Sequence, residues 1–112
     1  LVMLSSVAGD RGRRGNYAYG TAKAALTSYM SGLRGRGLEK GVHVLTVKPG
    51  PVRTPLTEGR ELPLTVNVEP VARDIVDAIE HKRKVIYTPG FWRFLMFGFR
   101  MLPEWIAARF KF

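Results

Sequence analysis

Cysteine is absent from the chain, and histidine occurs at only two of the 112 positions. The lack of cysteine excludes a disulfide scaffold, a thiolate zinc site and a cysteine nucleophile. His43 and His81 lie far apart in the sequence and could not build a histidine-rich metal site without help from carboxylates, so we predict no metal site. Long apolar runs are absent too, since none reaches the ~18 residues of a transmembrane helix.

Acidic residues are scarce, because nine Asp and Glu stand against 18 Lys and Arg, for a formal net charge of +9. Such an excess is typical of chains that meet nucleic acid, an anionic membrane or a phosphorylated ligand, and also of a solvated face. A nucleic-acid module is disfavoured, since the basic residues are scattered and the aromatic residues gather in an apolar tail. A serine hydrolase is disfavoured because no G-x-S-x-G motif occurs.

The composition is that of a folded segment, with 46% hydrophobic and 24% charged residues, and 112 residues allow at most one small domain. The sequence opens on an apolar, strand-like run at residues 1–4 with no polar residue before it. We therefore expect the chain to begin within a fold, as a portion of a larger domain.

Three short apolar runs predict buried strands, and three longer segments with apolar residues at three- and four-residue spacing predict helices. In chain order these elements span residues 1–4, 17–40, 42–47, 70–81, 85–87 and 91–101. Their alternation predicts an α/β, doubly wound fold with a parallel sheet and right-handed crossovers. Residues 1–90 would form this part of the domain, and residues 91–112 an aromatic, basic tail that belongs to it.

The first predicted helix is expected to bury one apolar face and to end at Gly41. Gly32, Gly35 and Gly37 weaken its second half, by roughly 1 kcal/mol each relative to alanine. The expected buried face consists of Ala22, Ala25, Leu26, Tyr29, Met30 and Leu33.

Tyr19 and Lys23 lie on one face of this helix, one turn apart, because they are four positions apart in the sequence. A nearby ammonium favours the phenolate, which would make Tyr19 a usable proton donor to a carbonyl oxygen, or acceptor from an alcohol, nearer neutral pH. The other tyrosines lack a lysine four residues later. The spacing alone is also typical of ordinary helix surfaces, so the neighbouring segments must decide whether the pair is functional.

Two strand ends supply that context. Ser6 is the second residue after the run 1–4, and the PGPVRT segment at 49–54 begins two positions after the run 42–47. In open parallel sheets, ligands bind at the carboxyl ends of the strands. Both segments should therefore meet at the edge of the sheet where the helix of Tyr19 begins.

The spacing of Ser6, Tyr19-x-x-x-Lys23 and the PGPVRT segment resembles the short-chain dehydrogenase/reductase family over essentially the whole chain. The resemblance implies the last three strands and following helices of a doubly wound Rossmann fold. It also implies an oxidoreductase that uses NAD or NADP to interconvert a carbonyl and a secondary alcohol. In that family's pattern Tyr19 is the general acid/base, Lys23 assists it, and Ser6 orients the substrate carbonyl. Tyr19 and Lys23 would also contact the cofactor, with the lysine on the nicotinamide ribose.

The same resemblance implies that Pro49 and Gly50 form the wall beside the nicotinamide. The main chain of Val52 and the hydroxyl of Thr54 would hold its carboxamide. The family's glycine-rich pyrophosphate turn, its residue that selects NAD or NADP and its catalytic asparagine all lie before the position of Leu1. We therefore expect the 112 residues alone to bind NAD(P)H weakly and to turn over little.

Arg11, Arg13 and Arg14 lie between Ser6 and Tyr19, beside the expected substrate mouth. This segment is either a solvated loop or a patch that recognises phosphate, since guanidinium groups match phosphate oxygens in a bidentate fashion. The second interpretation would suit a phosphorylated or lipid-phosphate substrate.

The tail at 91–112 holds eight of the twelve aromatic residues. An almost wholly apolar helix must either be buried, against its own domain, a partner subunit or a substrate tunnel, or lie in a membrane interface. Spanning a membrane is disfavoured, because residues 91–102 are too few and include Arg93 and Arg100.

The arginine-rich loop, the PLTV segment at 63–66 and the tail together resemble reductases of lipid-linked keto-sugars, such as the decaprenylphosphoryl 2-keto-pentose reductases. That narrower resemblance implies a lipid-linked carbonyl substrate and a cytoplasmic protein at the periphery of the inner membrane. Family membership implies a homo-oligomer, with Tyr29, Met30 and Leu33 as interface candidates. Two alternatives stay open: a non-catalytic membrane-associated fragment, and a basic binding module.

Overall fold

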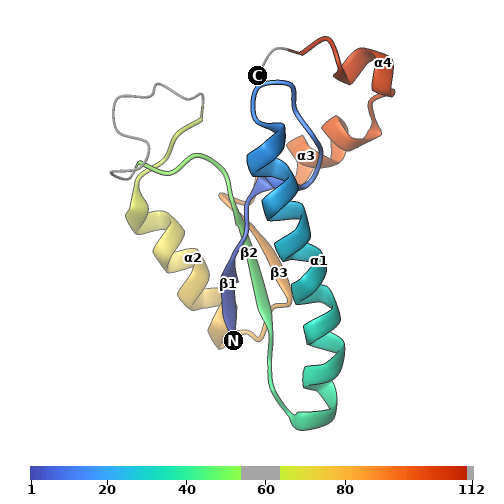
Figure 1. Ribbon diagram of the computed structural model, residues 1–112. Helices are drawn as coiled ribbons and strands as arrows, with labels where there is room; N and C mark the ends of the chain where they lie inside the picture. The colour runs from blue at the N-terminus through green and yellow to red at the C-terminus, as the bar shows by residue number, and fades with distance from the viewer. Residues whose placement is uncertain (54–63, 111–112) are drawn as a thin grey trace.

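The computed structural model describes residues 1–53 and 64–110, and it alternates strands and helices as expected (Figure 1). The elements are β1 (Val2–Leu4), the 3-10 helix η1 (Val7–Gly9), α1 (Tyr17–Lys40), β2 (Leu45–Pro49), α2 (Val68–Glu80), β3 (Val85–Thr88), α3 (Trp92–Met101) and α4 (Glu104–Ala107). The predicted α/β fold class is therefore confirmed.

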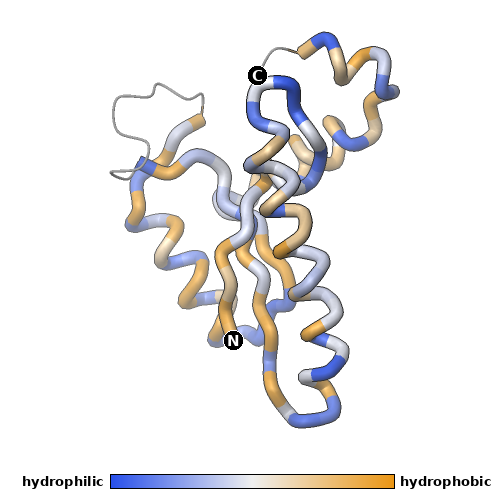
Figure 2. Tube along the Cα trace, viewed as in Figure 1, coloured by the Kyte–Doolittle hydropathy of each residue, from blue (hydrophilic) through white to orange (hydrophobic). Residues whose placement is uncertain are grey.

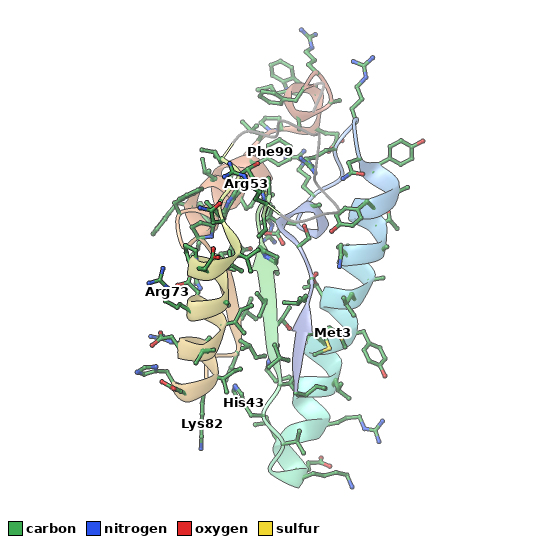
Figure 3. All side chains as sticks on the ribbon, turned by 90° about the vertical axis from the view of Figure 1, so that its left-hand side faces the viewer. Met3, His43, Arg53, Arg73, Lys82 and Phe99 are labelled. Atoms are coloured by element: carbon green, nitrogen blue, oxygen red, sulfur yellow. The ribbon has the colours of Figure 1, made fainter. Side chains whose placement is uncertain are left out.

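The three strands form one parallel sheet in the order β1-β2-β3. The register pairs Val2 with Leu45, and Thr46 with Val85. Because the strands are parallel, their carboxyl ends lie at one edge. Figure 3 shows Arg53 and Phe99 at that end of the molecule, and His43 and Lys82 at the other.

The central strand β2 is covered on both faces. Leu45 and Val47 form the core with Ala78 of α2, against which Ile75 and Ile86 pack. Thr46 points to the opposite face, since side chains alternate along a strand, and there its hydroxyl accepts a 2.9 Å hydrogen bond from a guanidinium of α1. Figures 1 and 3 both show α1 and α2 on opposite sides of the sheet.

This arrangement corrects one prediction. The strand order advances steadily from β1 to β3, while α1 and α2 cover opposite faces. The two crossovers therefore have opposite hands, and only one can be the right-handed connection that we expected for both. The physical reason is that β2 is buried on both faces, so each face needs its own helix.

The buried face of α1 also differs from the prediction. Of the expected residues only Met30 is buried, and Tyr29 is among the most exposed large side chains of the helix. The contact face instead includes Gly20, Met30 and Gly37, which are the buried residues of α1. Small residues occupy this face because they let the helix backbone approach its neighbours closely. Apolar periodicity does not detect such positions.

The strand bounds shift slightly, and β1 is less buried than predicted. Leu1 is 57% exposed and Leu4 is 54% exposed, because β1 is an edge of the described sheet. The second strand begins at Leu45 rather than at 42, since the chain first turns away from α1. Figure 2 shows hydrophobic residues along the strands, and the loop before α1 as mostly hydrophilic.

Gly41 ends α1 as expected, in the left-handed conformation with φ of 69°. The amide N–H groups of Gly41 and Val42 both donate to the carbonyl oxygen of Gly37. Glycine tolerates this conformation without steric cost, so the cap follows from the sequence.

The two glycines at 35 and 37 provide a matched test of packing against α1. A Cβ at Gly37 would lie 2.7 Å from the carbonyl oxygen of Val42, whereas a Cβ at Gly35 would meet nothing within 4 Å. Gly35→Ala should raise the free energy of unfolding by about 1 kcal/mol, because alanine favours the helix. Gly37→Ala should lower it by about 1–3 kcal/mol despite the same gain.

Urea unfolding followed by circular dichroism would measure both changes. A stabilising effect of Gly37→Ala equal to that of Gly35→Ala would contradict the close contact between α1 and Val42.

Candidate active site

Tyr19 and Lys23 lie in the first turns of α1, and the structure brings them together as the spacing predicts. The Nζ atom of Lys23 lies 5.6 Å from the centroid of the Tyr19 ring. The same atom donates a 3.1 Å hydrogen bond to the carbonyl oxygen of Leu4, at the end of β1. The ammonium is therefore held between the tyrosine ring and the carboxyl edge of the sheet.

Ser6 lies at that edge, two residues after the end of β1, and is buried. Its Oγ accepts a 3.1 Å hydrogen bond from the amide of Ala8 and so caps η1. A hydroxyl that accepts one bond keeps its own proton for donation. The neighbouring Ser5 makes the link to α1, since its Oγ donates to the carbonyl oxygen of Lys23 at 3.0 Å and lies 2.6 Å from the hydroxyl of Thr27.

Two glycines bring the Ser6 segment against α1. A Cβ at Gly9 would lie 2.7 Å from the amide nitrogen of Ala24, and a Cβ at Gly20 would lie 2.7 Å from the carbonyl oxygen of Ala8. Neither position can carry a side chain without a backbone shift. The contact between η1 and α1 is thus backbone against backbone, and it fixes Ser6 relative to Tyr19.

The turn after β2 leaves the same edge of the sheet. Pro49 ends the strand, and the amide of Gly50 donates to the carbonyl oxygen of Thr88 at 3.1 Å. Val52 forms a parallel bridge with Val66. The predicted cofactor contacts Pro49, Gly50 and Val52 therefore lie in the same region as Ser6. Thr54, the fourth, lies outside the described residues.

Trp92, the first residue of α3, packs directly on this turn. A Cβ at Gly50 would overlap the indole ring, so the ring occupies the space that a side chain at 50 would need. The indole Nε1 is buried and has no hydrogen-bond partner among the described residues. This contact could not be predicted from the sequence, because no local pattern links residues 50 and 92.

A buried cluster ties the loop after Ser6 to the sheet. Lys48 donates to Asp10 at 2.9 Å, and the side chains are only 11% and 3% exposed. The hydroxyl of Tyr87 on β3 donates to the other carboxylate oxygen of Asp10, and Nζ of Lys48 lies 3.4 Å from that hydroxyl. The sequence signal for this cluster is Lys48 itself, because a lysine within a buried strand requires a partner.

The cluster changes the ionisation of Tyr87. Burial, together with the hydrogen bond to Asp10 and the negative charge of that carboxylate, raises the pKa of Tyr87 to about 12. Arg93 and Arg100 act in the opposite direction. The neutral phenol is therefore the form that the folded chain favours.

The three loop arginines separate in the structure. Arg11 is held by the end of the tail, since its guanidinium donates at 2.7 Å to the carbonyl oxygens of both Phe99 and Leu102, and at 2.8 Å to Glu104. The predicted substrate contact of Arg11 therefore competes with a structural contact that no local sequence pattern indicates. Arg11 binds there because the carbonyl groups at the end of α3 lack partners within the helix.

Arg13 lies in the loop before α1 and is partly buried. Partial burial lowers the pKa of Arg13, and the charge of a Tyr19 phenolate opposes this change. Arg14 is exposed at the start of the turn before α1. Within residues 1–53 and 64–110, no group of three or more histidines or carboxylates is arranged to hold a metal ion.

With this geometry established, comparison with known proteins gives the family. Residues 1–63 match the family model described as short chain dehydrogenase. The chain belongs to the short-chain dehydrogenase family.

Particular relatives are similar over almost all of the chain. An uncharacterized oxidoreductase of Mycobacterium tuberculosis is 40% identical over 97% of this chain, and another of Streptomyces coelicolor is 37% identical over 97%. The chain spans 44% and 43% of the lengths of these two relatives. The acetoacetyl-CoA reductase of Allochromatium vinosum is 40% identical over 51% of the chain and 23% of its own length.

The Tyr87 cluster generates a prediction about pH. Since the folded pKa of Tyr87 is raised to about 12, above the ordinary value of 10.0, its stabilising effect is fully present below pH 10 and is lost as the pH rises through 12. Spectrophotometric titration of the tyrosines should show one late transition near pH 12. Tyr87→Phe should remove it, and Asp10→Asn should move it towards lower pH. A late transition that persists in Tyr87→Phe would assign it to another tyrosine.

Proposed function

We propose that this chain carries the proton-transfer part of an NAD(P)-dependent reductase that interconverts a carbonyl and a secondary alcohol. The observation that supports this most is the Tyr19–Lys23 pair, held at the carboxyl edge of the sheet beside Ser6. Membership of the short-chain dehydrogenase family supports the same class. Ser6 would hold the substrate carbonyl through its hydroxyl proton, while Tyr19 donates a proton to the carbonyl oxygen.

Lys23 has two tasks in this proposal. Its ammonium stabilises negative charge on Tyr19 after the proton has left, because opposite charges attract at this range. An ammonium also carries three N–H donors, of which one is used on Leu4. Its remaining donor capacity fits the ribose hydroxyls of a nicotinamide cofactor, NAD or NADP. The cofactor supplies the hydride, and the protein supplies position and the proton.

The substrate class rests on the arginine loop. We propose that Arg13 and Arg14 meet a phosphate-bearing substrate, with a lipid-linked keto-sugar as the candidate, since both lie in the loop between Ser6 and Tyr19 and guanidinium groups pair with phosphate. Arg11 is already bound to the tail, so we assign it an indirect part, as a residue that holds the loop in place.

Tyr19→Phe tests the catalytic proposal, with Tyr17→Phe as a matched control two residues earlier. The assay follows the oxidation of NADH or NADPH with acetoacetyl-CoA and with a keto-sugar phosphate as substrates. It uses the longest natural protein that contains the 112 residues of this chain. Tyr19→Phe should lower kcat by about 10²–10⁴-fold, since it removes the general acid, while the cofactor Kd changes little. Tyr17 is exposed and has no lysine four residues later, so Tyr17→Phe should leave kcat unchanged.

Equal losses in both variants, or full activity in Tyr19→Phe, would contradict the assignment. Absence of any activity with either cofactor and a range of carbonyl compounds would favour the alternative of a non-catalytic fragment.

We also propose that the tail rests on an anionic membrane surface from the cytoplasmic side. No helix among the described residues is long and apolar enough to cross a membrane. However, Met101 and Trp105 are exposed near the junction of α3 and α4, and Leu95 is exposed on α3. Arginine side chains accompany them, as in helices that lie in the interface of an anionic bilayer.

Flotation with phosphatidylglycerol vesicles tests this contact. The double variant Met101→Gln, Trp105→Gln should reduce the floated fraction at least about threefold, because it removes apolar groups that would enter the interface. Leu38→Gln, at an equally exposed position on α1, should not reduce it. Unchanged flotation of the double variant would remove the tail from the proposal.

A further inference from the structure

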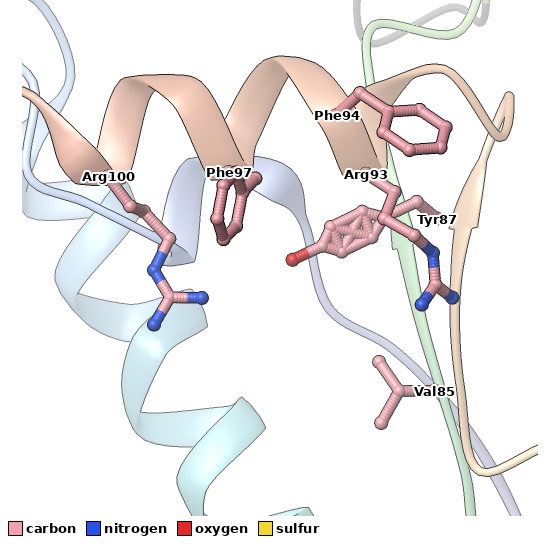
Figure 4. A pocket seen from close by; sticks show the side chains of 6 residues that line it. All are labelled: Val85, Tyr87, Arg93, Phe94, Phe97 and Arg100. Carbon is pink, nitrogen blue, oxygen red and sulfur yellow. The ribbon is translucent and has the colours of Figure 1, made fainter.

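A groove of about 520 Å³ lies between β3 and α3, apart from Ser6 and Tyr19 (Figure 4). Its volume is within the usual range for sites that hold small ligands. The residues that line it are Val85, Tyr87, Arg93, Phe94, Phe97 and Arg100.

The groove is open because α1 covers this face of the sheet over β2 and leaves part of β3 uncovered. Val85 and Tyr87 are two residues apart on β3, so both side chains point to one face of the sheet. That face also carries Lys48, which contacts the hydroxyl of Tyr87, and is the face on which α1 packs over β2. α3 passes over the end of β3 and supplies the second wall (Figure 4).

The charge in the groove is positive. Arg93 and Arg100 are seven residues apart on α3, about 10 Å along the helix axis, and neither forms an ion pair with a described residue. The guanidinium of Arg93 lies 5.7 Å from the centroid of the Tyr87 ring. The nearby carboxylate of Asp10 is already bound by Lys48 and Tyr87, so it does not neutralise the arginines.

The apolar part of the groove is large and exposed. Phe94 is 76% exposed and Phe97 is 65% exposed, although both are aromatic residues next to an apolar strand. Figure 4 shows Phe97 between Arg100 and Tyr87, with Phe94 near Arg93. Cationic groups and open aromatic rings thus alternate along one wall.

We propose that this groove binds an amphiphilic anion, with its phosphate or carboxylate group on the arginines and its apolar body on Phe94, Phe97 and Val85. Guanidinium groups form strong, charge-assisted hydrogen bonds to such anions. A ligand chain would cover aromatic surface that is otherwise in water. A second copy of the chain is a poorer occupant, because α3 carries no acidic residue and two such faces would oppose arginine to arginine.

Isothermal titration of the full chain with dodecyl phosphate, kept monomeric, tests the proposal. We expect saturable binding in the micromolar range. Inorganic phosphate and dodecyl maltoside should each bind at least about tenfold more weakly, since one lacks the apolar body and the other lacks the charge. Equally tight binding of either control, or no saturable binding of dodecyl phosphate, would overturn the proposal.

Variants then locate the ligand. Arg100→Gln and Phe97→Ala should each weaken binding about tenfold, whereas Arg109→Gln should change it less than twofold. Arg109 lies over Trp105 at the end of the tail, outside the groove. Circular dichroism confirms folding, and Phe97→Ala remains informative if Arg100→Gln unfolds, because Phe97 is largely exposed. Equal losses in Arg109→Gln would overturn the groove as the site, as would binding to phosphatidic acid vesicles without binding to monomeric dodecyl phosphate.

Discussion

A carboxylate that is almost wholly buried needs a cation beside it, and the pairing of Asp10 with Lys48 meets this need near the carboxyl end of β2. The pair joins the loop after η1 to β2, and Tyr87 extends it to β3. Arg11, the next residue, binds the end of α3. Two adjacent residues of opposite charge therefore hold the same loop to the sheet on one side and to the tail on the other.

The loop that is held in this way begins at Ser6 and ends at the turn before Tyr19. Its position depends on the sheet through Asp10 and on α1 through the close backbone contacts at Gly9 and Gly20. The candidate active site is thus supported from two directions, by an ion pair and by the absence of two side chains. Such support restricts the movement of Ser6 relative to the first turns of α1, which carry Tyr19 and Lys23.

The sequence predicted the order of the elements and the pairing of Tyr19 with Lys23, because both depend on local spacing. It did not predict which face of α1 is buried. Apolar periodicity selected Ala22 and Tyr29, whereas the structure buries Gly20 and Gly37, whose value lies in close approach rather than in hydrophobicity. The contacts of Arg11 and Trp92 were also missed, since each joins segments far apart in the chain, and no local pattern encodes the partner.

For Lys48, the sequence predicts that a partner exists but not which residue it is. A lysine inside an apolar strand requires a partner, whereas the choice of Asp10 depends on how the loop folds back over the sheet. Likewise, Arg11, Arg13 and Arg14 are alike as residues of one loop, and only the structure shows that Arg11 is held by the end of α3.

The indole of Trp92 rests where the side chain of residue 50 would be. The tail therefore packs on the backbone of the turn after β2, and a side chain at position 50 would need the space that the ring of Trp92 fills. In related chains a residue larger than glycine at 50 should accompany a smaller residue at 92, so these two distant positions should vary together.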